Sequence, residues 1–160
     1  MGIFSGMNTS ASALTAQRLR LDLIANNIAN INTTNTGKVT AGGNPIPYSR
    51  EVAYFSASNP NKDFSSVFRN AKESLYGKGV EVTSIMEDDA PYRLEYNPDS
   101  PDAIKTAEEG LPVGYVRYPN VNIVEEMVDM ISASRAYEAN ITALNASKAM
   151  ASKALEIGKG

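Results

Sequence analysis

The chain has 160 residues, of which 42% are hydrophobic and 21% charged, so it can fold around a core of its own. Its formal net charge of −3 argues against a nucleic-acid partner, because binding phosphates requires a basic face. The absence of cysteine and histidine removes disulfides, thiolate ligands, and the commonest general base and metal ligand. We therefore expect a protein that is not an enzyme and that uses no metal or cofactor.

Residues 1–35 predict a long amphipathic helix. Apolar side chains recur every 3.5 residues, and no proline or glycine interrupts the pattern between Met7 and Ile31. The positions of this repeat are Ile3, Met7, Ser10, Leu14, Gln17, Leu21, Ile24, Ile28 and Ile31.

Asparagine is concentrated where this helix pattern ends. The stretch "ANNIANINTTNTGK", residues 25–38, holds five of them. Asparagine is a poor helix former, and one or two would suffice to cap a helix. The stretch is therefore either an ordinary solvated helix end or a set of amides that need partners.

Residues 36–120 differ from both ends of the chain, because all eight prolines fall there. Alternation at Val52, Tyr54 and Ser56 predicts one strand, and residues 80–85 and 92–96 predict two more, joined by a solvated hairpin turn at 88–91. The acidic run at 87–89 lacks the ligand spacing of a calcium loop. These residues predict a small β-rich module.

Residues 121–160 carry the clearest helical period, with a predicted helix over 122–157 that Asn122 caps. Stepping by 3.5 residues from Ile123 gives Met127, Met130, Ser134, Tyr137, Ile141, Leu144, Lys148, Ala151 and Leu155. Two such seams at opposite ends of one chain predict an antiparallel coiled coil, the alternative being that both helices pack on a central core. The expected fold is α+β, with the β-rich module between paired terminal helices.

No apolar run approaches the ~20 residues needed to cross a bilayer, and the first residues lack the pattern of a secretory signal. We therefore expect a chain that does not span a membrane and that carries no cleaved signal peptide.

Two stretches, "LRLDLIANNIANINT" and "GYVRYPNVNIVEEMVDMISASRAYEAN", resemble the terminal segments of bacterial flagellar axial proteins. The second is most similar to those of the proximal rod. The residues 103–112 and the loop in the 40s depart from the family pattern and look expanded.

The resemblance implies that the terminal helices form the inner layer of a helical tube around the export channel, with the β-rich module outside. It implies a structural subunit that transmits torque, in the periplasmic rod of the basal body. Its implied partners are copies of itself, other rod proteins and the rod-base and export-gate components. The flagellar type III export apparatus would secrete it.

Within such an assembly we expect the asparagine cluster to bond neighbouring subunits and to face water in the single chain. Replacing Asn27 and Asn30 by alanine should then impair assembly without destabilising the isolated subunit. The residues that we expect at subunit interfaces are Leu21, Ile24, Asn26, Asn27, Ile28, Asn30, Asn32, Pro119, Asn120, Asn122, Met127, Met130, Ile131, Arg135, Tyr137, Asn140, Ile141 and Leu144.

Two other functions stay open at this point. One is a secreted binding module that uses a coiled coil to hold a single partner. The other is a small hydrolase that works through carboxylates. Electron microscopy separates the first from a rod subunit, because only the latter forms a helical tube.

Overall fold

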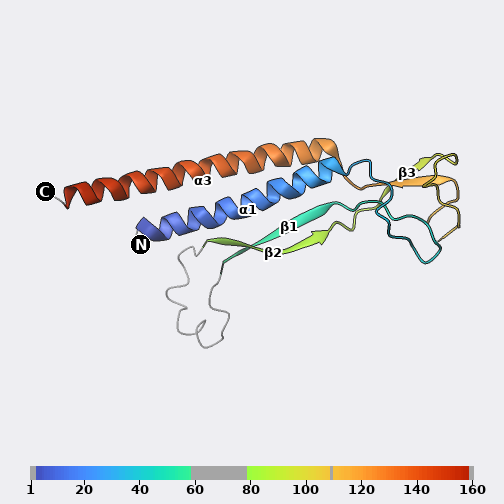
Figure 1. Ribbon diagram of the computed structural model, residues 1–160, viewed down its shortest axis with the longest axis horizontal. Helices are drawn as coiled ribbons and strands as arrows, with labels where there is room; N and C mark the ends of the chain where they lie inside the picture. Colours follow the sequence, from blue (N-terminus) through green and yellow to red (C-terminus); the bar gives the residue numbers. More distant parts are fainter. Residues whose placement is uncertain (1–2, 59–78, 109, 159–160) are drawn as a thin grey trace, which may run out of the picture. The chain divides into compact units, whose positions relative to one another are not determined.

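The computed structural model describes residues 3–58, 79–108 and 110–158. Two long helices lie at the ends of the chain and short strands lie between them (Figure 1), which confirms the α+β fold. The elements in chain order are α1 (Ile3–Ala29), β1 (Glu51–Ala57), β2 (Val80–Glu87), β3 (Arg93–Tyr96), β4 (Tyr115–Tyr118) and α3 (Ile123–Ile157).

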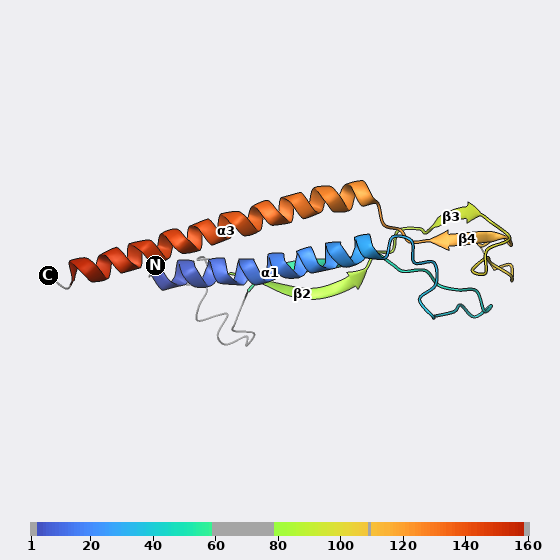
Figure 2. The same cartoon turned by 45° about the horizontal axis from the view of Figure 1, so that its top comes forward.

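The chain forms two compact units, and each helix contributes to both. The first unit contains Met1–Leu21, Ala53–Ile85 and Ile131–Gly160, and the second contains Asp22–Val52 and Met86–Met130. Within each unit α1 and α3 run side by side in opposite directions (Figures 1 and 2), as the two seams predict.

The N-terminus of α3 is capped as predicted. The Asn122 side-chain oxygen accepts a hydrogen bond from the Val124 amide at 3.1 Å, and the Asn122 carbonyl accepts the Glu126 amide at 3.0 Å. Glu125 and Glu126 occupy the first turn, where the helix dipole favours negative charge.

Helix α1 is covered on most of its circumference. Ala16, Leu23 and Ile24 are buried, and none of the predicted seam residues from Met7 to Ile31 is exposed. The side chain of Ile3 lies outside the described residues.

In the first unit β2 begins against α1. The amide of Val80 donates to the Ser12 hydroxyl at 3.1 Å. Gly79 has a φ of +94°, and a Cβ there would lie 2.3 Å from that hydroxyl oxygen, so this close approach requires glycine.

Helix α3 is covered along one stripe only, and the predicted seam is partly wrong. Met130, Ser134, Tyr137, Leu144 and Ala151 lie on the covered side, as expected. Five predicted seam residues are exposed instead: Ile123, Met127, Ile141, Lys148 and Leu155, of which Leu155 is 76% exposed. At every second step of the repeat, a residue one position before the predicted one is covered, and these residues are Glu126, Ala133, Asn140 and Ser147. Because apolar residues surround this helix, its periodicity did not determine which face packs.

The strands form two separate two-stranded sheets, β1 with β2 and β3 with β4. The second sheet is antiparallel, with Arg93 opposite Tyr118 and Tyr96 opposite Tyr115. The predicted hairpin between β2 and β3 is therefore wrong. The segment between them is held instead by Asn120, whose amide donates to the carbonyls of Asp88 and Ala90 at 2.9 and 3.0 Å.

Candidate functional site

A partly buried polar cluster joins α1, α3 and the segment that leads into β1 in the second unit. This polar junction consists of Asn27, Tyr48, Arg50, Glu51 and Glu126. The Glu126 side chain is 0% exposed, and both of its carboxylate oxygens have partners. One accepts from the Arg50 Nε at 2.6 Å and the other accepts from the Asn27 amide at 3.2 Å. The junction therefore satisfies a carboxylate that would otherwise be costly to bury.

Asn27 supplies the remaining bonds of the polar junction, and it is 1% exposed. Its oxygen accepts from the Tyr48 hydroxyl at 2.8 Å and from the Glu51 amide at 2.9 Å, while its nitrogen also donates to the Glu51 carbonyl at 3.0 Å. The expectation that Asn27 faces water in the single chain is therefore wrong. Its amide is used within the chain, because α1 ends where three other segments converge.

Arg50 lies among several carboxylates. Besides Glu126 it pairs with Asp88 and Asp129, each at 3.4 Å. Burial alone would lower the pKa of Arg50. Its hydrogen bond and charge contact with Glu126, and then those with Asp88, raise the pKa by more than burial lowers it, so the net shift is upward. Arg50 therefore stays charged and holds the junction together.

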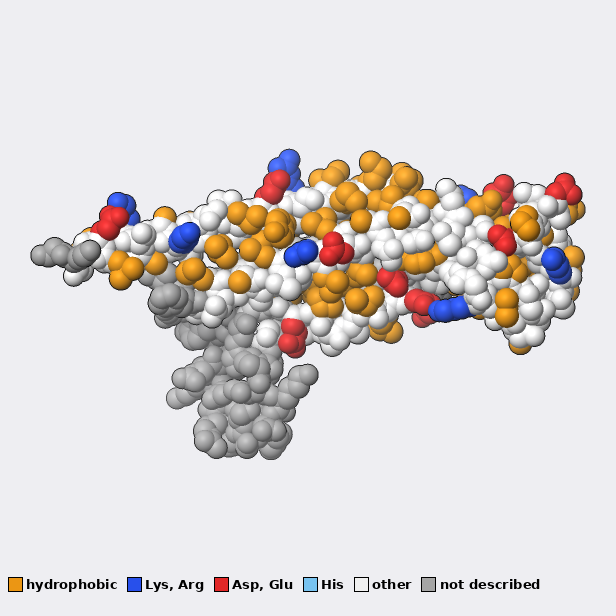
Figure 3. All heavy atoms as spheres, viewed as in Figure 1, with side chains coloured by type: hydrophobic (Ala, Val, Ile, Leu, Met, Phe, Trp, Pro, Cys, Tyr) orange, Lys and Arg blue, Asp and Glu red, His pale blue; other side chains and the backbone are white. Residues whose placement is uncertain are grey.

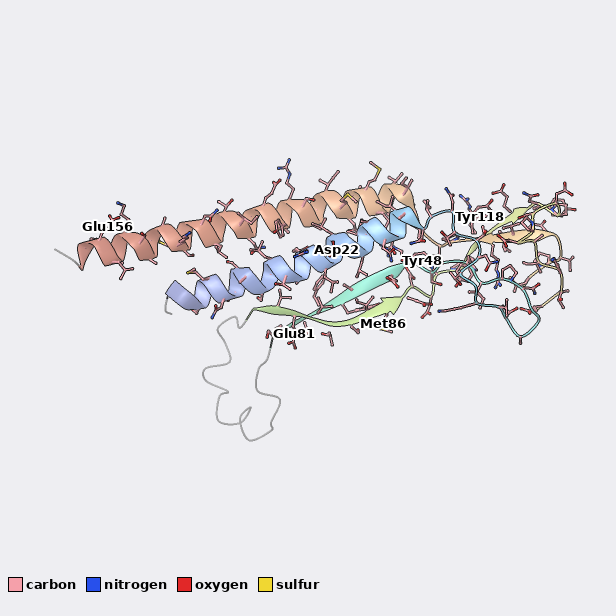
Figure 4. All side chains as sticks on the ribbon, viewed as in Figure 1. Asp22, Tyr48, Glu81, Met86, Tyr118 and Glu156 are labelled. Atoms are coloured by element: carbon pink, nitrogen blue, oxygen red, sulfur yellow. The ribbon has the colours of Figure 1, made fainter. Side chains whose placement is uncertain are left out.

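Tyr48 is the second titratable group of the junction with a shifted pKa. In Figure 4 it lies just before β1. Burial raises the pKa of Tyr48 to about 12, helped by the negative charges of Glu51, Glu126 and Glu87. Its hydroxyl therefore remains a hydrogen-bond donor to Asn27 at physiological pH.

The other asparagines also bond mainly within the chain. Asn120 accepts the Arg50 amide at 2.8 Å, and Asn30 donates to the Asn26 side-chain oxygen at 2.9 Å. Asn140 donates to the Ala136 carbonyl at 2.8 Å, whereas Asn32 is exposed. Asn27 and Asn120 thus link segments that are distant in the sequence, whereas the bonds of Asn30 and Asn140 join residues four positions apart.

The start of α3 exposes a group of large apolar side chains, which we call the α3 apolar face. Figure 3 shows hydrophobic side chains gathered over this part of the helix. They are between 46% and 65% exposed, and they are Ile123, Val124, Met127, Val128 and Ile131. In contrast, α1 has no exposed large hydrophobic residue among its described side chains.

The predicted interface residues fall into three groups. Ile24, Asn27 and Pro119 are buried. The half-buried ones are Leu21, Ile28, Asn30, Asn120, Met130, Tyr137, Asn140 and Leu144. The exposed ones, which another chain can reach, are Asn26, Asn32, Asn122, Met127, Ile131, Arg135 and Ile141. Sequence reasoning omitted Val124 and Val128, although their apolar character beside the predicted seam could have indicated a second packing face.

The described ranges contain no group of three or more potential metal ligands of the kind that binds an ion. Within the same ranges no helix is long and apolar enough to cross a membrane. The arrangement is thus one of helix pairing and exposed apolar surface.

Comparison with models of protein families identifies the class of protein to which the chain belongs. Residues 7–35 match the family model described as flagella basal body rod protein, and residues 113–157 match the flagellar basal body rod FlgEFG protein C-terminal model. These two segments are the paired helices with the strand that leads into α3, so the chain is of the flagellar rod class.

Relatives over the full length narrow the class to one family. The chain is 47% identical to the flagellar basal-body rod protein FlgC of Borreliella burgdorferi, covering 100% of both chains. It is 45% identical to FlgC of Bacillus subtilis and 34% identical to FlgC of Escherichia coli O157:H7, covering 99% of this chain and 100% of each relative. The chain belongs to the FlgC family of flagellar basal-body rod proteins, which confirms the resemblance to proximal rod proteins.

Proposed function

We propose that this chain assembles with copies of itself and with other rod proteins into the helical tube of the basal-body rod. The tube transmits torque and surrounds the export channel. In this role the chain is a structural element rather than a catalyst. Its place is the periplasmic rod, which it reaches through the type III export apparatus without a cleaved signal. Its further partners are the components of the rod base and the export gate.

The observation that carries this proposal is the α3 apolar face. Apolar surface gains about 25 cal/mol for each Å² removed from water, so five large side chains on adjacent turns favour a covering partner. Because the polar junction fixes the start of α3 against α1 and the residues before β1, these side chains cannot turn inward without breaking the Arg50–Glu126 pair. A neighbouring subunit in a tube would supply the cover.

We further propose that the predicted interface residues divide by role. The exposed ones contact neighbouring subunits directly. The buried ones, Asn27 above all, hold the helices in the arrangement that presents the exposed ones. The helices would thus form an inner assembly domain and residues 36–120 an outer module.

The test is a charge placed on the α3 apolar face. In a strain that lacks the native gene, Ile131→Asp should abolish motility and recovery of complete basal bodies. Ser132→Asp is the matched control, because it puts the same charge at the next exposed position of α3, beside that face. Normal swimming with Ile131→Asp would contradict the proposal. A purified chain that never forms tubes but captures one partner by the same face would support the binding-module alternative.

A further inference from the structure

A stripe of exposed residues with a 3.5-residue period runs along each helix, and the two stripes complement each other. The outer stripe of α1 consists of Ala11, Thr15, Arg18, Asp22, Ala25 and Ala29. The outer stripe of α3 consists of Val124, Val128, Ile131, Arg135, Glu138 and Thr142. Every side chain in both sets is exposed, and spacings of three and four residues alternate in each set.

We propose that the outer stripe of α3 in one copy packs antiparallel on the outer stripe of α1 in a second copy of this chain. The inference rests on the proposed function, and it names the partner and the register of the contact. Copies that point the same way along a tube would bring these two helices together in opposite directions, as they run within one chain.

Size complementarity supports one register. When Val128 lies opposite Ala29, Ile131 lies opposite Ala25, so these two branched side chains of α3 each meet an alanine of α1. Small residues let helix axes approach closely and leave room for bulky side chains from the facing helix. Val128 and Ile131 of the α3 apolar face would then be covered by the part of α1 that carries only alanines in its outer stripe.

Charge complementarity supports the same register. One turn further along, Arg135 lies opposite Asp22 and Glu138 lies opposite Arg18. Arg135 and Glu138 bond each other at 3.0 Å in the single chain, where their side chains are 78% and 64% exposed. Exposed pairs of this kind are weak, so they can extend into a four-charge network without a large loss. Antiparallel pairing in any register shifted by one turn would leave an aspartate or arginine against the apolar residues.

The contact joins two different surfaces, so it does not close on itself. Each copy would offer an α3 stripe to one neighbour and an α1 stripe to the other. Such heterologous contacts generate rings or open helical assemblies rather than isolated dimers. A rod built this way would grow with the polar junction of every copy left intact.

The cysteine-free sequence permits a direct crosslinking test. Two copies would be expressed together in a strain lacking the native gene, one with Val128→Cys and one, of different size through a tag, with Ala29→Cys. Isolated basal bodies would be oxidised and separated without reducing agent. Disulfides require Cα atoms within about 7 Å, so the mixed dimer reports the register. The control replaces Ala29→Cys by Ala11→Cys, which lies in the same stripe but about 27 Å along the helix.

A mixed dimer at least tenfold above the control is expected. Rods that form without a mixed dimer would overturn the proposed contact and leave the rod function standing, as would a crosslink from Val128→Cys to a protein of another mass. Failure of the native chain itself to restore rods would overturn the rod function.

A charge exchange covers the case in which the cysteine variants do not assemble. Arg135→Asp should shrink the swimming halo by at least half, and adding Asp22→Arg to the same chain should recover most of the loss. A double variant no better than Arg135→Asp would overturn the contact.

Discussion

Helices α1 and α3 are built from similar mixtures of small and apolar residues, yet the single chain covers them to different extents. Helix α1 keeps only a narrow stripe of small and polar side chains in contact with solvent. Helix α3 covers one stripe, where Glu126 and Ala133 are buried, and leaves a group of large apolar residues at its start outside. The difference shows that a helix can pack one stripe within the chain and still leave large apolar residues exposed, where we propose that the next copy covers them.

The polar junction explains how this arrangement is held. Hydrophobic burial alone would favour turning the Ile and Val residues of α3 toward α1. The paired Glu126 prevents that rotation, since both of its oxygens have partners that would be left unsatisfied. A buried ion pair thus selects one face, which is the role best attested for buried polar groups in helix pairs.

The largest expected loss of stability comes from removing the buried carboxylate on the covered side of α3. Glu126→Ala leaves Arg50 and the Asn27 amide without their shared partner, and removing one member of a buried ion pair costs about 3–5 kcal/mol. Urea unfolding of the purified chain, followed by circular dichroism, measures the change. Glu125→Ala is the control, because its exposed side chain should alter stability by less than about 0.5 kcal/mol. Equal losses in both variants would show that the junction does not hold the helices.

The corresponding change on α1 is Asn27→Ala. Its four hydrogen bonds disappear, and each orphaned buried group costs about 1–3 kcal/mol, so a net loss of stability is expected despite the better helix propensity of alanine. This reverses the expectation from the sequence that replacing Asn27 and Asn30 leaves the isolated chain no less stable. Asn32→Ala, at an exposed position, is the control. An Asn27→Ala chain as stable as the native one would restore the earlier view.

A smaller effect should distinguish the two sides of α3. Ala133 is 0% exposed, so Ala133→Leu overpacks the covered stripe and should cost about 1–3 kcal/mol. Ala139 lies on the exposed side, where leucine is nearly as good a helix former. Ala139→Leu should therefore leave the urea midpoint within error. The reverse order of stability would place the covered side elsewhere.

The smallest expected effect is a dependence of stability on pH, which comes from the ionisation of Tyr48. Its pKa is raised from 10.0 in an unfolded chain to about 12 in the fold. A raised pKa means that the protonated form is favoured in the folded state, so this contribution is complete below pH 10 and is lost as the pH rises toward 12. Absorbance of the ionised phenol should show one tyrosine titrating late, and Tyr48→Phe should remove it. A late tyrosine that persists in Tyr48→Phe would assign the shift to another residue.

Sequence reasoning predicted the elements better than their contacts. The 3.5-residue repeats and the cap at Asn122 placed α3 over 122–157, against Ile123–Ile157 in the structure. The strands before residue 97 were predicted because β-forming residues lie between prolines and glycines. Strand β4 was not predicted, although three of its four residues, Tyr115, Val116 and Tyr118, are of types that favour strands.

The contacts could not be predicted because they join segments far apart in the sequence. Asn27 meets Glu126 across almost the whole chain, and nothing in the local pattern of either residue indicates the other. The packed face of α3 was misjudged for a related reason. Hydrophobic periodicity finds apolar residues without distinguishing those that pack within the chain, such as Met130, from those left outside, such as Met127.

The most direct measurement of the central claim, that the large residues of α3 are free in one copy and covered in the rod, is thiol labelling of a single introduced cysteine. Val128→Cys should react rapidly with a maleimide in the purified chain and at least tenfold more slowly in intact basal bodies. Ala133→Cys, on the covered stripe, should react slowly in both. Equal labelling of Val128→Cys in the free chain and in the basal body would contradict the account.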